Sequence, residues 1–282
     1  MELKTVGKGF SWGAVSVINA MPCGIGAVIG TELGTRSEFL SKGGSRTVEI
    51  LNDRSEPTLL AELCVSASYR VAGIEEPDGW HLTTHSDIPP SRGLKSSSSA
   101  CNAMISSVFD EIGFKADSLD LIKLGVECAK WAKVTRTGSF DDACGCHYGG
   151  FIMTDNRTDE ILLMQDFPIY DVIVHIPKLK IRKEGLDVDA LRKVANEQRR
   201  VIELSKTDPL KAMTLNGRII AEASGLDNSV AEMALNAGAV AAGISGSGPA
   251  TAVILEYGGA DVFLKDTGLE DAIVTRTRKL TK

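Results

Sequence analysis

The spacing of apolar residues along the chain predicts a fold that mixes strands with helices. Short apolar or alternating runs predict strands at residues 14–18, 47–51, 148–153, 161–163, 171–176, 240–244 and 251–255. Apolar residues at helical spacing predict helices at about 57–69, from the serine run at 96–99 to Gly113, from about residue 117, and at 188–204, 209–224 and 229–236. The chain has 282 residues and no internal repeat or linker, so it is long enough for two domains or subdomains.

Residues 89–99 form a loop rich in proline, glycine and serine that leads into one of these helices. A helix start exposes unpaired backbone N–H groups and carries a partial positive charge, which suits a bound phosphate. Lys95 adds a mobile positive charge, and the serine hydroxyls can reach phosphate oxygens or a metal. Serines also cap helices that bind nothing, and the loop is not a Walker A sequence. The candidate nucleotide-binding residues are Pro89, Pro90, Ser91, Arg92, Gly93, Leu94, Lys95, Ser96, Ser97, Ser98 and Ser99.

Two later segments carry further candidate chemistry. Asp141 and Asp142 stand side by side in a glycine-flanked loop at residues 137–143, where one carboxylate can accept a proton from an attacking hydroxyl. A solvated surface turn is the alternative for this pair. Residues 243–250 place glycines between two apolar runs, so their backbone can lie against a ligand, with a plain hairpin as the alternative.

These segments resemble, in the same order, the motifs of the GHMP kinases, which include galactokinase, homoserine kinase and mevalonate kinase. Residues 13–20 are similar to motif one, 89–100 to motif two, 137–143 to the loop with the catalytic aspartate, and 243–250 to motif three. Lys95 departs from the glycine that is usual at its position in motif two. The archaeal-type shikimate kinases have a similar Gly-Leu-Lys-Ser-Ser-Ser run, so the chain most resembles that branch, although motif three is nearest to the homoserine kinase form.

The resemblance implies an α+β fold of two lobes, with a ribosomal-S5-domain-2-like N-terminal lobe and a ferredoxin-like C-terminal lobe. We expect the lobes at residues 1–155 and 156–282, with the active site in the cleft between them. The implied function is phosphorylation of the shikimate 3-hydroxyl in aromatic amino-acid (chorismate) biosynthesis, with ATP and Mg²⁺. The alternatives are another kinase of the superfamily, acting on homoserine, pantoate or a mevalonate-type acceptor, and a non-catalytic homologue that binds a nucleotide or metabolite.

The resemblance also implies roles for individual residues. It places Asp141 at the position of the catalytic aspartate, whereas Asp142 falls where relatives vary. Ser97 or Ser98, together with Glu127, is implied as a magnesium ligand, and a solvated position on its helix is the alternative for Glu127. The implied substrate contacts are Ser16, Asn19, Gly246, Ser247 and Gly248.

Several other polar residues are weaker candidates. Lys8 is the counterpart of an N-terminal lysine that some relatives place near the transferred phosphate. Arg92 or Arg136 can hold an acceptor carboxylate in a bidentate pair. We favour structural roles over metal binding for the residues with metal-like spacing, because the histidines lie in an extended segment and the cysteines lack a second ligand pair. These residues are His81, His85, Cys144, Cys146 and His147.

Charge and cysteine content narrow the expected partners and location. The net charge of −6 argues against a nucleic-acid partner, because such binding depends on basic residues. We find no export signal and no apolar run that would span a membrane, and we expect the six scattered cysteines to be free thiols in the cytoplasm. The expected partners are therefore ATP and shikimate, and the sequence leaves the oligomeric state open.

Overall fold

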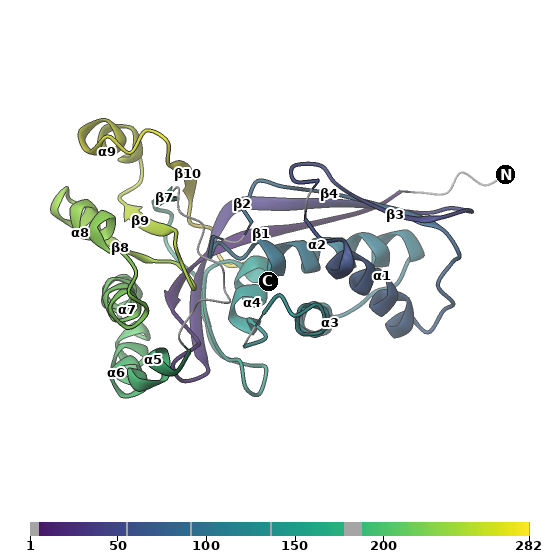
Figure 1. The fold of residues 1–282 in the computed structure, drawn as a ribbon, viewed down its shortest axis with the longest axis horizontal. Coiled ribbons are helices and arrows are strands. Elements are labelled where there is room, and N and C mark those ends of the chain that lie inside the picture. The colour runs from purple at the N-terminus through teal and green to yellow at the C-terminus, as the bar shows by residue number, and fades with distance from the viewer. Residues whose placement is uncertain (1–5, 55, 91, 136, 178–187, 282) are drawn as a thin grey trace.

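The computed structural model describes residues 6–54, 56–90, 92–135, 137–177 and 188–281. Two sheets and their flanking helices form two lobes that lie side by side (Figure 1). Two residues named above, Ser91 and Arg136, lie outside the described residues. Within the described part of the chain, no helix is long and apolar enough to cross a bilayer.

The first sheet is organised around one long strand, β2 (Ile25–Ser41). Along one side β2 pairs antiparallel with β1 (Gly7–Ile18), and along the other its two halves pair antiparallel with β4 (Trp80–Ser86) and β5 (Phe151–Asp155). The sheet is completed by β3 (Arg46–Ile50), parallel to β4, and β6 (Glu160–Gln165), antiparallel to β5. Because β1 and β2 are long, their connected ends extend past the rest of the first sheet towards the helices of the second lobe (Figure 1).

Helices cover one side of the first sheet, as Figure 1 shows. They are α1 (Leu59–Ala72), α2 (Ser96–Ile112), α3 (Ser118–Trp131) and α4 (Phe140–Tyr148). The helix α2 lies directly against β1, because a Cβ at Gly9 would overlap the carbonyl oxygen of Ala103. Fully buried side chains of the sheet, among them Phe39 and Trp80, pack against Ile105 of α2 to form the core beneath. This packing fixes α2, and with it the preceding loop, against the sheet.

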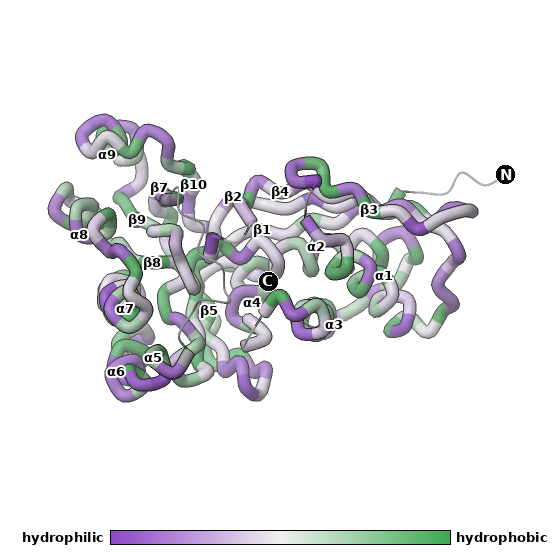
Figure 2. Tube along the Cα trace, in the orientation of Figure 1, coloured by the Kyte–Doolittle hydropathy of each residue, from purple (hydrophilic) through white to green (hydrophobic). Residues whose placement is uncertain are grey.

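The second sheet has the order β10-β7-β9-β8, with every neighbouring pair antiparallel. Its strands are β7 (Asp171–His175), β8 (Ala241–Ile244), β9 (Thr251–Leu255) and β10 (Ile273–Arg276). The helices that connect β7 to β8 are α5 (Val188–Lys193), α6 (Ala195–Ser205), α7 (Pro209–Ser224) and α8 (Ser229–Asn236), and α9 (Ala260–Thr267) connects β9 to β10. This order of strands and helices is ferredoxin-like. Figure 2 shows hydrophilic residues on the outer turns of α6 and α9.

One hydrophobic core cluster passes from the first lobe into the second. It joins Val15 and Val17 of β1 to Val172 of β7 and to Ala212 and Met213 of α7. These side chains are almost completely removed from water. Because the lobes share this core, the loop that starts α2 and the hairpin loop between β8 and β9 are held at a fixed distance from each other.

The predicted fold class is confirmed, and most predicted elements are present. The helices α2, α7 and α8 lie where the sequence predicts them, and the side chain of Asp208 accepts a hydrogen bond from the Lys211 amide at the start of α7, at 3.0 Å. The predicted helix at 188–204 is divided into α5 and α6. The strand predicted from residue 148 begins only at Phe151, because Tyr148 still belongs to α4. The division at residue 155 stays a prediction, and β6, which follows it, pairs with β5 of the first sheet.

Candidate active site

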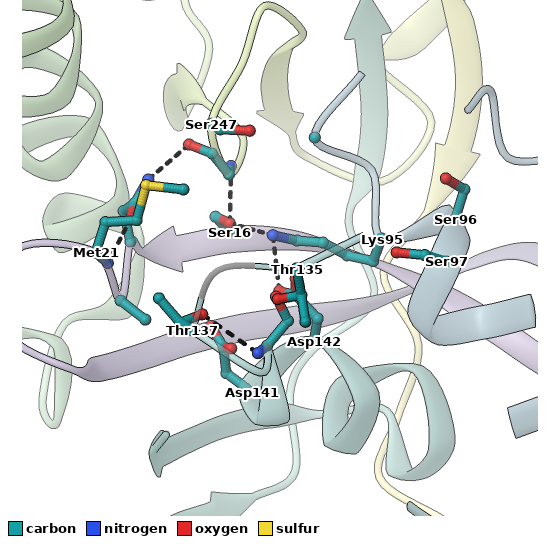
Figure 3. A pocket seen from close by; sticks show the side chains of 15 residues that line it. Ser16, Met21, Lys95, Ser96, Ser97, Thr135, Thr137, Asp141, Asp142 and Ser247 are labelled. Atoms are coloured by element: carbon teal, nitrogen blue, oxygen red, sulfur yellow. Dashed lines mark hydrogen bonds and ion pairs between the residues drawn. The ribbon is translucent and has the colours of Figure 1, made fainter. Parts of the chain in front are cut away.

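Four segments that are far apart in the sequence meet at one point between the lobes. The hydroxyl of Ser16 on β1 accepts hydrogen bonds from the Nζ of Lys95, at 2.7 Å, and from the backbone N–H of Gly246, at 2.9 Å. The Nζ of Lys95 lies 2.8 Å from Oδ1 of Asp142 at the start of α4. Figure 3 shows the Lys95 side chain reaching to both Ser16 and Asp142. All the segments with kinase-like sequence patterns therefore contribute to one site.

The loop before α2 is fastened to the loop between β8 and β9. The hydroxyl of Ser245 donates to the carbonyl of Gly93 at 2.8 Å and accepts from the amide of Ser16 at 3.1 Å. Gly93 has a φ of 80°, and a Cβ at this position would overlap the carbonyl oxygen of Ser245. Glycine is therefore required at position 93 both by the left-handed backbone and by the close approach of the two loops.

Lys95 also has a left-handed backbone, with a φ of 68°. This conformation explains why a glycine is usual at this position in similar sequences, and a lysine adopts it at an energetic cost. In return, its ammonium group lies beside Asp142 and near Asp141, with 5% of the side chain exposed. Burial alone would lower the pKa of Lys95, but the two carboxylates outweigh burial and raise it. The predicted mobile charge is thus a fixed cation.

Asp141 lies in the first turn of α4, not in a loop, and the residue is 4% exposed. Oδ1 accepts a hydrogen bond from the amide nitrogen of Asn156 at 2.7 Å. Burial raises the pKa of Asp141 to about 7, and repulsion from Asp142 adds to the shift, while Lys95 and Asn156 oppose it. A carboxylate that titrates near neutral pH is suited to accept a proton from a hydroxyl group.

Gly26 on β2 provides the space that the Asp141 carboxylate occupies. A Cβ at Gly26 would overlap both Oδ2 and Cγ of Asp141. We therefore expect Gly26→Ala to displace the carboxylate and to lower kcat by about 100-fold, since a displacement of about 1 Å can have this effect. For the kinase activity that the resemblance implies, the KM for ATP should change little. Gly43→Ala is the control, because a Cβ there meets nothing within 4 Å. Unchanged kcat in Gly26→Ala would contradict this placement of Asp141.

A second cavity, of about 290 Å³, adjoins the site and has mostly apolar walls. It is lined by Leu59, Leu60, Pro90, Ala100, Met104 and Val134, with Asn52, Asp53 and Glu56 at its polar part. Ser96 and Ser97, in the first turn of α2, line both this cavity and the polar cleft of about 80 Å³ that holds Asp141 and Lys95. The start of α2 therefore stands between an apolar and a polar compartment.

The other predicted nucleotide-binding residues differ in what they contact. The hydroxyl of Ser99 donates to the carbonyl of Ser11 and is also hydrogen-bonded to the Thr35 hydroxyl inside the protein, and Ser98 is buried. Leu94 belongs to the shared core. The Arg92 guanidinium donates to the carbonyl of Pro177 at 3.3 Å. The polar cleft is therefore lined by four of the predicted residues, Gly93, Lys95, Ser96 and Ser97, and the apolar cavity by Pro90. Neither is lined by Pro89, Leu94, Ser98 or Ser99.

Several predicted contacts are not brought together. Glu127 of α3 has a side chain that is 48% exposed and forms an ion pair with Arg70 at 3.0 Å, so it does not line the polar cleft. Lys8 lies on β1, where its backbone amide donates to Asp110, and it also lies outside the cleft. Of the predicted substrate contacts, Gly248 does not line the cleft, whereas Ser16, Asn19, Gly246 and Ser247 do.

The cleft also contains residues that were not among the predicted site residues. The hydroxyl groups of Thr135, Thr137 and Ser139, just before α4, add polar groups to its wall. Their position directly before the aspartate pair was the available signal. Asn156 could not be found in this way, because an Asp-Asn pair between two strands is typical of an ordinary turn.

Three of the residues with metal-like spacing, His81, Cys144 and Cys146, are hydrogen-bonded or buried within the protein. Both ring nitrogens of His81 hydrogen-bond to threonine hydroxyls, those of Thr47 and Thr83. Cys144 and Cys146 are buried in α4 as free thiols. Among the described residues, no group of three or more His, Cys, Asp or Glu side chains is arranged to hold a metal ion.

The two-lobed fold and the polar cleft match the GHMP kinase class that the sequence patterns suggest. Comparison with known proteins gives the same class. Residues 59–150 match the model of the GHMP kinases N terminal domain. The mevalonate kinase of Methanococcus jannaschii superposes with a TM-score of 0.80 over 100% of this chain and 99% of its own, at 16% sequence identity. At this identity the likeness concerns the fold.

Curated relatives give the narrower assignment. A shikimate kinase of Methanobrevibacter smithii is 34% identical over 251 residues, which is 86% of either chain. A shikimate kinase of Pyrococcus furiosus is 32% identical over 280 residues, covering 98% of this chain and 100% of its own. The chain belongs to the archaeal shikimate kinase family of the GHMP kinases, and with it to the ATP-dependent small-molecule kinases.

Proposed function

We propose that this protein transfers the γ-phosphoryl group of ATP to the 3-hydroxyl of shikimate. The observation that carries the proposal is the position of the α2 start. Ser96 and Ser97, in the first turn of α2, lie between an apolar cavity and a polar cleft. The cleft contains the Lys95 cation and Asp141, whose pKa is about 7. This division suits a nucleotide and an acceptor hydroxyl, because the faces of the base pack on apolar walls whereas the phosphates are charged and the hydroxyl is polar.

The nucleotide would lie across the start of α2. Its base would occupy the apolar cavity, where Asn52 and Asp53 offer polar groups. Its phosphates would then lie at the first turn of α2, where free backbone N–H groups and the helix dipole favour anions. Ser96 and Ser97 would add hydroxyl donors. In this arrangement the loop and the first turn of α2 bind the phosphates, as the sequence predicts, but fewer of the predicted side chains contact them.

Magnesium fits the residues at this point. Mg²⁺ usually keeps several waters and phosphate oxygens and takes few protein ligands. The hydroxyl of Ser97 would be its protein ligand here, whereas the outward position and ion pair of Glu127 do not fit that role. When bound, the ion would neutralise negative charge on the phosphates. No larger set of acidic ligands is needed for this.

Asp141 and Lys95 would carry out the remaining chemistry. Phosphoryl transfer depends mainly on positioning and on neutralising charge on the transferred group. Asp141 would accept or orient the proton of the attacking hydroxyl, and Lys95 would offer a fixed positive charge at the same cleft. The hydroxyl groups of Thr135, Thr137 and Ser247 would bind other oxygens of the acceptor.

The choice of shikimate rests on the curated relatives, which are named shikimate kinases at 32–34% identity over most of the chain. Homoserine and mevalonate are the second candidates, because solved structures of those kinases have the same fold. The polar cleft, lined by many hydroxyl groups, favours an acceptor with several hydroxyls.

An ADP-release assay over an acceptor panel tests the proposal. The panel contains shikimate, homoserine, pantoate, mevalonate and no acceptor, each with ATP and Mg²⁺. We expect turnover with shikimate alone. Turnover with another acceptor would retain the kinase chemistry and reject shikimate. ATP binding without turnover on any acceptor would reject the proposed reaction.

A further inference from the structure

Two buried polar residues, Asn156 and Thr154, form a hydrogen-bonded group with Asp141. Asn156 follows β5 and is 5% exposed, and Thr154 of β5 is completely buried. The amide nitrogen of Asn156 donates to Oδ1 of Asp141 at 2.7 Å, and the backbone N–H of Asp141 donates to Oδ1 of Asn156 at 3.0 Å. Asn156 thus contacts both the backbone and the carboxylate of one residue.

The hydroxyl of Thr154 fixes which end of the Asn156 amide faces Asp141. It donates to Oδ1 of Asn156 at 2.6 Å, and the backbone N–H of Asp141 donates to the same oxygen. Two donors on this oxygen require that the NH₂ end points to the Asp141 carboxylate, because a flipped amide would face donor to donor. The backbone N–H of Asn156 is itself bonded to the carbonyl of Gly24, at 2.8 Å.

We propose that Asn156 is a positioning residue, which holds the Asp141 carboxylate in place and keeps it as a hydrogen-bond acceptor. This inference rests on the proposed role of Asp141 as the base. Gly26 of β2, which pairs with Thr154 of β5, lies against the other carboxylate oxygen, since a Cβ there would overlap Oδ2 of Asp141. The carboxylate therefore lies against both the NH₂ group of Asn156 and the backbone of β2.

The position of Asn156 has a chemical consequence besides a geometric one. Its NH₂ group can only donate to Asp141, so it favours the ionised carboxylate and opposes the effect of burial. Lys95 also favours the ionised form of Asp141. The other titratable groups around Asp141 are Asp142, Cys144 and Cys146, and a negative charge on any of them disfavours the ionised form of Asp141. Without Asn156, Asp141 would be protonated over more of the neutral pH range.

The test is the pH dependence of kcat in Asn156→Ala, Asn156→Asp and Thr154→Val. A base must be deprotonated, so kcat falls on the acidic side of its pKa, which lies at about 7 in Asp141. A lost hydrogen bond to a charged group should move this acidic limb up by about one to two pH units in Asn156→Ala. Asn156→Asp should move it further, because the two donors to Oδ1 favour an ionised carboxylate at position 156, and this adjacent negative charge raises the pKa of Asp141. Thr154→Val should move it less, since the amide remains.

Asn228→Ala is the matched control. Asn228 precedes α8 in the other lobe, and its amide likewise donates to a carboxylate, Glu232, at 3.0 Å. We expect the acidic limb of the kcat profile of Asn228→Ala to coincide with that of the unchanged protein. If Asn156→Ala lowers kcat equally at all pH values, or if Asn156→Asp behaves like Asn156→Ala, the residue is only structural and the inference is wrong.

A measurement that does not need turnover separates this inference from the proposed function. The Asp141 carboxyl carbon can be titrated by ¹³C NMR and identified by its loss in Asp141→Asn. A higher pKa in Asn156→Ala would support the role of Asn156 even if no acceptor on the panel were phosphorylated. An unchanged pKa would overturn it even if shikimate were the acceptor.

Discussion

Asp141→Asn is expected to lower kcat with ATP and shikimate by about 10²–10⁴, the usual contribution of a positioned general base. Asparagine has nearly the same shape and can still accept the hydrogen bond from Asn156 at Oδ1, but it cannot take a proton. Steady-state kinetics measure the effect. KM for ATP should stay close to its original value, since the carboxylate is not among the residues proposed to hold the nucleotide.

Although Asp141→Asn should lower kcat, it should raise the stability of the folded protein at pH 8. The pKa of Asp141 is raised in the folded state to about 7, so ionising it disfavours folding. The stability associated with the protonated form is present below the unfolded-state pKa and is lost as the pH rises to about 7. Asp141→Asn should therefore have a higher Tm than the unchanged protein at pH 8, with little difference at pH 4. Asp120→Asn, an exposed aspartate in the first turn of α3, is the control and should leave both kcat and Tm near their original values. Near-normal kcat in Asp141→Asn would contradict the proposed role.

Lys95→Met should have the second large effect. Removing one preorganised charge from a site where negative charge develops typically lowers kcat by about 10²–10³. The loss of Lys95 would also raise the pKa of Asp141, because Lys95 favours the ionised carboxylate. The acidic limb of the pH profile should thus move up while the maximum of kcat falls. Kinetics as a function of pH would show both effects together.

The same substitution leaves Asp142 without its cation in a site where little of either side chain is exposed. Removing one member of a buried pair typically destabilises a protein by about 3–5 kcal/mol. The double variant Lys95→Met/Asp142→Asn removes the unpaired charge and should recover much of this stability in urea unfolding. It should not recover kcat. Recovery of both would show that Lys95 acts only on stability.

Local patterns were sufficient for the elements that carry the phosphate loop. The apolar spacing after the serine run and the closing Gly113 predict α2 and its end, although the structure begins the helix at Ser96, with the serines in its first turn. Asp208 and Pro209 likewise predict the start of α7. These signals act within a few residues of one another, so tertiary contacts are not needed to interpret them.

Other elements depend on contacts that a single sequence does not show. The long strand β2 was not predicted, because Gly26, Gly30 and Gly34 interrupt the alternation of its apolar residues. Those glycines are explained by close neighbours, such as Asp141 at Gly26 and Gly149 at Gly30. The helix α4 was interpreted as a loop, because its carboxylates and glycine hid the apolar face that Phe140, Ala143 and Cys144 bury.

Within the site, the residue types were easier to predict than their partners. Asp141 and Lys95 do lie in one cleft, but the pairing of Lys95 with Asp142 and Ser16 joins three segments and could not be read from any one of them. The outward position of Glu127 follows from the inward positions of Ile122 and Val126 on the same helix, which the sequence pattern already contained. Asn156 required the structure, because its role depends on α4 and β5 meeting.

The most direct measurement is transfer of a γ-phosphoryl label from ATP to shikimate, followed in parallel for the unchanged protein and Asp141→Asn. We predict that the unchanged protein labels shikimate at its 3-hydroxyl, and that the variant binds ATP equally well but transfers label at least about 100-fold more slowly. Label that is released only as inorganic phosphate, or that reaches shikimate equally fast in the variant, would contradict a kinase site centred on Asp141.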